Sequence, residues 1–172
     1  GLSLFLTGKK AAGRTISITR IEEKLGLHAS PTCQMAFDGT PAQLVGEEGA
    51  GLAAMFTVMN HARIDVALQG VAHASRSHDI ARSYADERVQ GRRPDGSEAV
   101  LSDHADVRRM LAEMRADTFV ARAIAVACAQ AIDMGQATGD PAWTARAALL
   151  TPIAKAFGTQ TGMRVAETGV QV

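Results

Sequence analysis

Residues 103–114, DHADVRRMLAEM, carry the pattern that decides the fold. Their four large apolar side chains recur at i, i+3, i+4 and i+7, the spacing of one helical face: Val107, Met110, Leu111 and Met114. The pattern continues along the chain for about twenty more residues. We therefore predict a long helix over 103–134 with one buried face.

Helical spacing also precedes this segment. Residues 49–62 predict a short helix after a glycine-rich start, and residues 64–88 predict a long one. Between that helix and the next, the polar stretch at 93–103 has the composition of a loop.

A last helix is predicted after the turn at 135–140. Asp140 is a favourable N-cap, and Pro141 suits the first helical position because proline has no N–H to leave unpaired. Thr151 and Pro152 repeat this signal, so the helix either kinks there or ends and restarts.

The first 45 residues have a different character, that of short β-strands. Apolar and β-branched runs alternate with Gly, Lys, Asp and Pro turns, and they predict four strands: 2–7, 14–21, 33–37 and 42–46. The predicted fold class is thus a mainly helical α+β chain. Part of a β-domain at 1–47 is followed by an antiparallel helical bundle at 48–172.

The composition, 47% hydrophobic and 21% charged, is that of a globular protein. The 18 basic and 18 acidic residues cancel, so we expect no nucleic-acid partner. No uninterrupted apolar run reaches the length of a membrane span, and no signal-peptide pattern is present. Cys33 and Cys128 stand apart, as reduced thiols do, which predicts a cytoplasmic protein. Because both ends fall inside patterned segments, we expect an internal piece of a longer protein.

Seven short motifs follow one another along the chain. They are LGLHASPTCQMAFDG, LVGEEGAGL, NHARI, YADERVQGR, DHADVRRML, IAKAF and AETGVQV. In this order they resemble the flavin-dependent acyl-CoA dehydrogenases, from the end of the central β-domain through most of the C-terminal helical domain. The ERVQGR form at 87–92 resembles the bacterial branch that includes methylthiopropanoyl-CoA dehydrogenases.

The resemblance implies an enzyme that uses FAD to oxidise an acyl-CoA thioester. In that family a carboxylate takes the α proton while a hydride leaves the β carbon for the flavin. The resemblance also implies a homo-oligomer, either a dimer or a tetramer, and an electron-transfer flavoprotein as the acceptor. Two other functions remain open, a non-catalytic helical interaction module and an acyl-CoA oxidase. A di-iron bundle is disfavoured, because the sequence has no Glu-x-x-His pair and its histidines lack metal-ligand spacing.

Three residues match positions that approach FAD in the family: Arg88, His104 and Gln171. For Arg88 the implied role is a guanidinium contact with the pyrophosphate of FAD in a neighbouring subunit. Its alternative role is a cation at a helix end, favoured by the helix dipole. For His104 the alternative is a capping or surface role. Gly91 stands where the family often has Phe, so an apolar contact with the cofactor is absent or supplied elsewhere.

Asn60 and Arg63 match a family Asp-x-x-Arg that contacts acyl-CoA, with a structural ion pair of Arg63 as the alternative. Ala62 stands where some members carry the catalytic Glu, and an alanine cannot take a proton. The resemblance therefore implies no catalytic residue within this chain and a base that lies beyond Val172.

Overall fold

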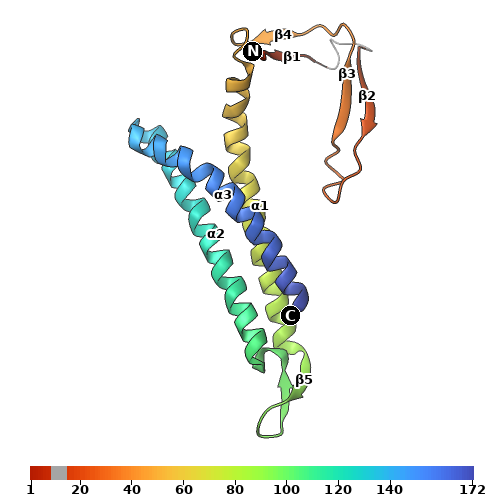
Figure 1. The fold of residues 1–172 in the computed structure, drawn as a ribbon, viewed down its shortest axis with the longest axis vertical. Helices are drawn as coiled ribbons and strands as arrows, with labels where there is room; N and C mark the ends of the chain where they lie inside the picture. Colours follow the sequence, from red (N-terminus) through yellow and green to blue (C-terminus); the bar gives the residue numbers. More distant parts are fainter. Residues whose placement is uncertain (9–14) are drawn as a thin grey trace. The chain divides into compact units, whose positions relative to one another are not determined.

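The computed structural model describes residues 1–8 and 15–172, which form two compact units, Gly1–Val58 and Met59–Val172. The first unit holds four strands and the start of a long helix: β1 (Leu4–Leu6), β2 (Ile16–Ile21), β3 (Cys33–Phe37), β4 (Gln43–Val45) and α1 (Gly51–Glu87) (Figure 1). The second unit holds the rest of α1 and the remaining elements: β5 (Val89–Arg92), β6 (Glu98–Val100), the 3₁₀ helix η1 (Leu101–Asp103), α2 (Ala105–Thr138) and α3 (Pro141–Gln171).

The four predicted strands of the first unit are confirmed. They pair antiparallel as two separate ladders, β1 with β4 and β2 with β3. Phe5 lies opposite Leu44 in the first ladder, and Ser17 lies opposite Ala36 in the second. The strand predicted at 14–21 starts one residue outside the described part of the chain.

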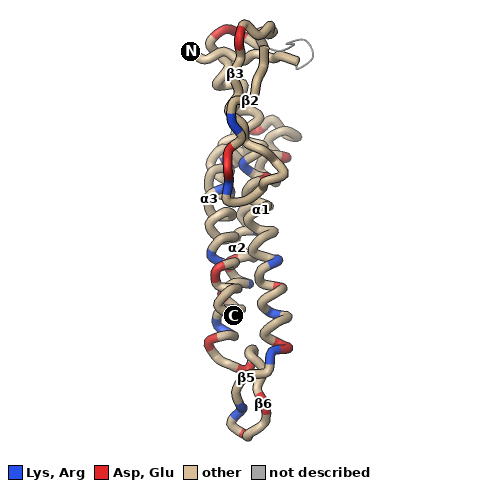
Figure 2. Tube along the Cα trace, turned by 90° about the vertical axis from the view of Figure 1, so that its right-hand side faces the viewer, with Lys and Arg blue, Asp and Glu red and all other residues tan. Residues whose placement is uncertain are grey.

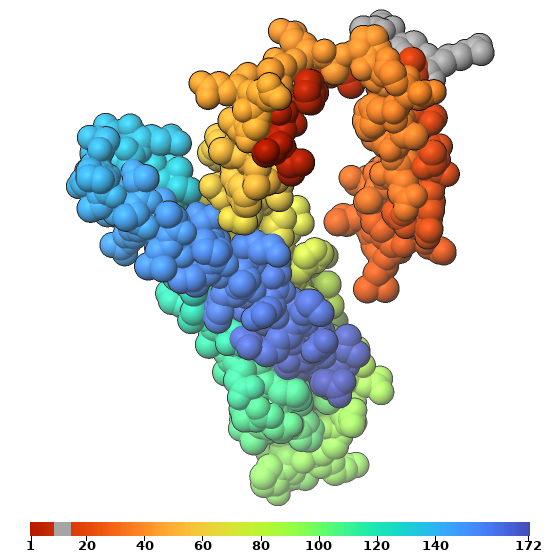
Figure 3. All heavy atoms as spheres, turned by 45° about the horizontal axis from the view of Figure 1, so that its top comes forward, coloured from red at the N-terminus to blue at the C-terminus, as the bar shows by residue number. Residues whose placement is uncertain are grey.

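The second unit consists of three long helices and one hairpin, which confirms the mainly helical fold class. Figure 1 shows α2 running opposite to α1 and α3, and Figure 3 shows α3 lying along α2. The predicted interruption between residues 62 and 64 is wrong, because α1 continues through it. Neither Gly nor Pro occurs at that point, so nothing in the local sequence ends the helix.

Capping residues mark the C-terminus of α2 and the N-terminus of α3. Asp140 accepts a hydrogen bond from the Ala142 N–H at 2.8 Å, as predicted for the N-cap of α3. α2 extends to Thr138, beyond the start of the predicted turn, and Gly139 closes it at φ 68°. α3 continues through Pro152, so the alternative of an end and a restart is wrong.

Part of the predicted loop at 93–103 is instead a hairpin. β5 and β6 pair antiparallel around a turn that contains Asp95 and Gly96, the latter at φ 85°. The Asp95 carboxylate accepts hydrogen bonds from the Ser97 N–H at 2.9 Å and from its hydroxyl at 2.7 Å. An Asp-Gly pair is a strong hairpin signal, so the sequence contained the information.

The three helices pack through small residues. A cluster near the hairpin, which we call the hairpin-end cluster, is formed by six buried side chains: Ala74, Ala81, Ala85, Leu111, Met114 and Val165. Farther from the hairpin, the backbones of α1 and α3 lie in close contact. A Cβ at Gly162 would lie 2.8 Å from the carbonyl oxygen of Gly70, and one at Gly158 would lie 2.8 Å from that of Ala67. Glycine is needed at both positions because no side chain fits between the helices.

Charged side chains are interspersed along the three helices rather than gathered by sign (Figure 2). Among the described residues, α2 is long and apolar enough to cross a membrane by length and composition. The sequence prediction on this point considered uninterrupted runs only, whereas hydropathy averaged over 18 residues tolerates one or two charges. Core helices of soluble proteins pass the same test, and 28% of the apolar stretch of α2 is buried in this structure.

Candidate functional site

Three of the predicted site residues belong to one end of the helical unit: Arg88, His104 and Gln171. Each lies within three residues of a side chain that forms the hairpin-end cluster or packs against it: Ala85, Leu101 and Val172. Their backbone positions thus lie at the hairpin end, although the hollow that Gln171 lines includes neither Arg88 nor His104.

Arg88 lies one residue past the end of α1. Its N–H still donates to the Tyr84 carbonyl at 2.9 Å, and its own carbonyl accepts from the Leu101 N–H at 2.9 Å. The side chain is exposed, and within the described part of the chain it makes no hydrogen bond or ion pair. The backbone at Arg88 is thus held by hydrogen bonds, and the donors of its guanidinium fork are available to an anion.

His104 is half-buried at the N-terminus of α2. It is the N-cap residue of that helix, and its carbonyl accepts the Arg108 N–H at 3.0 Å, but its side chain makes no capping hydrogen bond. Instead Nε2 lies 2.8 Å from the carbonyl oxygen of Gln90 in β5. A carbonyl oxygen can only accept, so Nε2 carries the hydrogen and Nδ1 is the remaining polar atom of the ring. Sequence reasoning missed this contact because it missed the hairpin.

Gln171 is exposed at the last residue of α3. It lines a hollow of about 310 Å³ between α2 and α3, together with Arg109, Glu113 and Arg164. Arg109 pairs there with Glu113 at 2.8 Å, and Arg164 pairs with Asp117 at 2.8 Å. Both cations thus have carboxylate partners, whereas the uncharged Gln171 amide and the Glu167 carboxylate also line the hollow.

Asn60 and Arg63 meet on one face of α1. The Nη1 atom of Arg63 donates to Oδ1 of Asn60 at 3.1 Å, and Arg63 as a residue is half-buried. The amide orients the guanidinium without adding a negative charge, unlike the Asp of the family motif. Ala62 lies between them, and no titratable group occupies its position.

The junction between the hairpin and α2 is fastened by Asp103. Its carboxylate accepts from the Val100 N–H at 2.9 Å and pairs with Arg93 at 2.7 Å. The hydrogen bond from the Val100 N–H is the main cause that lowers the pKa of Asp103, and the hydrogen bond from Arg93 is the second. This carboxylate therefore stays ionised and ties β6 to the loop of the hairpin.

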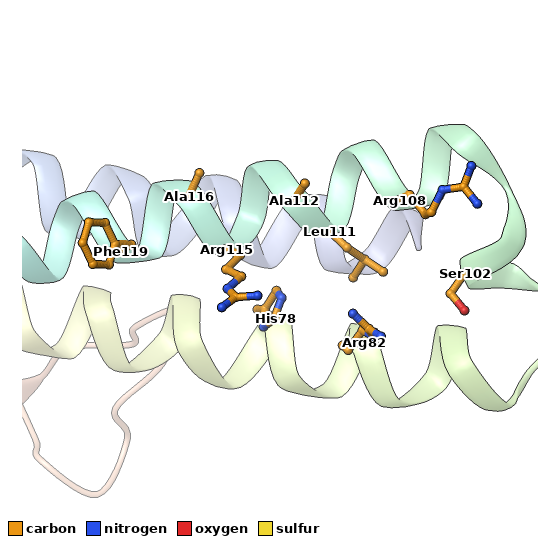
Figure 4. A pocket seen from close by; sticks show the side chains of 9 residues that line it. All are labelled: His78, Arg82, Ser102, Arg108, Leu111, Ala112, Arg115, Ala116 and Phe119. Atoms are coloured by element: carbon orange, nitrogen blue, oxygen red, sulfur yellow. The ribbon is translucent and has the colours of Figure 1, made fainter.

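A groove of about 660 Å³ runs between α1 and α2 (Figure 4). His78 and Arg82 line it from α1, and Arg115 and Phe119 line it from α2. Arg82 donates to Asp86 at 2.6 Å, and this bond is the main reason that the pKa of Asp86 is lowered. No predicted site residue lines the groove. Over residues 1–8 and 15–172, no group of three or more His, Cys, Asp or Glu side chains could hold a metal ion.

The sequence of residues 49–172 matches the family model that describes the C-terminal domain of acyl-CoA dehydrogenases. The chain belongs to the acyl-CoA dehydrogenase family. It is similar to 3-methylmercaptopropionyl-CoA dehydrogenase of Ruegeria pomeroyi, at 42% identity over 100% of the chain and 32% of the relative. It is also similar to butyryl-CoA dehydrogenase of Syntrophomonas wolfei, at 31% identity over 75% of the chain and 23% of the relative. The chain thus spans about a third or less of these relatives.

Solved acyl-CoA dehydrogenase structures share the fold. Butyryl-CoA dehydrogenase from Megasphaera elsdenii superposes with a TM-score of 0.80 at 25% identity, over 98% of this chain and 40% of that one. A Caenorhabditis elegans protein solved in complex with C11-CoA superposes with a TM-score of 0.87 at 24% identity, over 99% of this chain and 28% of that one. The second comparison bears on the fold alone.

Proposed function

We propose that this chain is part of an FAD-dependent acyl-CoA dehydrogenase that oxidises the α,β bond of an acyl-CoA thioester. The observation that carries the proposal is the exposed Arg88 guanidinium at a fixed backbone position, in a chain of this family. Its role as a pyrophosphate ligand is a property of the family, and the free donors of the fork suit it to that role.

The residues at the hairpin end fit a flavin cofactor. Arg88 offers a forked cation to a diphosphate, and the Gln171 amide offers both a donor and an acceptor to neutral groups. When bound, FAD supplies the redox chemistry by accepting the hydride from the β carbon. The protein's part is to bind the diphosphate, to orient the thioester and to supply a base.

Asn60 and Arg63 are the proposed acyl-CoA contacts. The 3.1 Å hydrogen bond holds the Arg63 guanidinium in one orientation, which lowers the entropy lost when it binds a polar group of the substrate. The relative from Ruegeria pomeroyi makes 3-methylmercaptopropionyl-CoA the first substrate to test, with butyryl-CoA as the second.

Three further parts of the proposal concern groups outside these residues. Ala62 cannot take a proton, so the catalytic base is another residue, which the resemblance to the family places beyond Val172. The electron acceptor of the complete enzyme would be an electron-transfer flavoprotein. A homo-oligomer, a dimer or a tetramer, lets Arg88 of one subunit reach the FAD of another.

The test is an anaerobic titration of the complete protein that carries these residues. Adding 3-methylmercaptopropionyl-CoA should bleach the visible flavin band, and free CoA at the same concentration should not. A protein without bound flavin, or one whose band survives excess of both acyl-CoA substrates, would contradict the proposal. Peroxide release at the rate of substrate oxidation in air would identify an oxidase instead.

A further inference from the structure

The hairpin after α1 is irregular next to Arg88. Val89 pairs with Val100 and Arg92 with Glu98, so three steps along β5 match two along β6. One extra residue therefore sits in β5, as in a β-bulge. Gln90 lies in this irregular part, outside the regular pairing register.

His104 closes this bulge from the side of α2. Its Nε2 donates to the Gln90 carbonyl at 2.8 Å, and its ring packs against Gly91. A Cβ at Gly91 would lie 3.3 Å from Cε1 of the ring, and φ of 82° there disfavours any residue with a side chain. Ring and backbone thus fit closely at this point.

Arg88 is consequently fixed on two sides. Its carbonyl accepts the Leu101 N–H at 2.9 Å, and two residues later His104 holds the Gln90 carbonyl. Both contacts therefore hold the backbone where the chain leaves α1.

We propose that His104 is a positioning residue for the flavin site: it holds the Gln90–Gly91 bulge and thereby aims Arg88 at the anion. This inference rests on the proposed function, in which Arg88 binds the FAD pyrophosphate. It differs from a direct contact of His104 with FAD, because the ring acts through the backbone of β5 and contributes nothing once Arg88 is absent.

A double-mutant cycle on the complete protein tests the inference, with FAD titrated into the apoprotein. His104→Ala should weaken FAD binding about two- to tenfold, the range for one hydrogen bond, when Arg88 is present. In the Arg88→Ala background the same substitution should change nothing further. His73→Ala, at an exposed histidine of α1, is the matched control and should leave affinity unchanged.

Two replacements separate positioning from general damage to the fold. His104→Gln places an amide donor at a similar reach and should restore most of the affinity, whereas the shorter amide of His104→Asn should not. Hydrogen exchange gives a readout independent of FAD. The Leu101 amide, bonded to Arg88, should exchange about two- to tenfold faster in His104→Ala and return to its original rate in His104→Gln.

Each adverse result has its own meaning. Equal losses of FAD affinity in both backgrounds would show a direct contact and overturn the positioning role, while leaving the proposed function intact. Unchanged exchange at Leu101 in His104→Ala would overturn the inference as well. If Arg88→Ala alone left the affinity for FAD unchanged, the assignment of Arg88 to the FAD pyrophosphate would be wrong. The positioning role of His104 would then be wrong as well.

Discussion

Arg63 donates a hydrogen bond from Nη1 to Oδ1 of Asn60, one helical turn earlier on α1, at 3.1 Å. Residues three apart on a helix are neighbours on its surface, so this contact follows from the sequence spacing alone. An amide in this place gives the guanidinium a hydrogen-bond partner without supplying an opposing charge.

Arg63→Ala should raise the KM for acyl-CoA about tenfold or more, since a hydrogen bond to a charged group contributes roughly 1.5–3 kcal/mol. Bound flavin should stay near one per subunit, because Arg63 is assigned to the substrate alone. Steady-state kinetics and flavin absorbance measure the two quantities, with Arg76→Ala as a control at an exposed arginine of the same helix. Loss of flavin at an unchanged KM would reverse the assignment.

Gly162→Ala should destabilise the helical unit by about 1–3 kcal/mol, the usual cost of overpacking. The new methyl would lie 2.8 Å from the Gly70 carbonyl oxygen, where only a backbone shift makes room. Gly169→Ala is the matched control in the same helix. Its Cβ meets the flexible end of Met114 at 3.4 Å, so better helix propensity should make it neutral or stabilising by up to about 1 kcal/mol. Urea unfolding compares the two variants, and equal midpoints would refute the close approach of α1 and α3.

Asp103 should make the thermal midpoint depend on acid pH. Its pKa is lowered in the fold by the Val100 N–H and Arg93, so its stabilising contribution is present above the pKa of the unfolded chain. That contribution is lost as the pH falls through the lowered value. Asp103→Asn should therefore lower the midpoint at neutral pH and make the fall towards acid shallower. Asp133→Asn, at an exposed carboxylate of α2, is the control. Parallel curves for Asp103→Asn and the original protein would contradict this role.

Local signals predicted much of the fold. The four strands, the Asp140 cap and the pattern through Met114 depend on neighbouring residues only, and all three are confirmed. The prediction of a helix break near residue 63 was wrong, because a change of sequence motif does not require a change of backbone conformation. The hairpin was missed although Asp95 and Gly96 carry its signal.

The site was harder to predict, because its contacts join distant segments. His104 and Gln90 are 14 residues apart, and their contact depends on where the bulge falls in the hairpin. Because the sequence analysis did not predict the hairpin, it could not predict that register. The role of Arg88 came from the order of family motifs, since locally it is an ordinary cation beside a helix end.

The most direct test of the flavin site is the affinity of the complete apoprotein for FAD with Arg88 replaced. Arg88→Ala should weaken FAD binding about ten- to a hundredfold, since it removes charge-assisted hydrogen bonds to a diphosphate. Arg88→Lys should recover only part of the loss, because a single ammonium cannot reproduce the guanidinium fork. Arg76→Ala should bind FAD as the original protein does. If Arg88→Ala keeps full affinity for FAD, Arg88 is only a cation beyond a helix end, and the proposed flavin site is wrong.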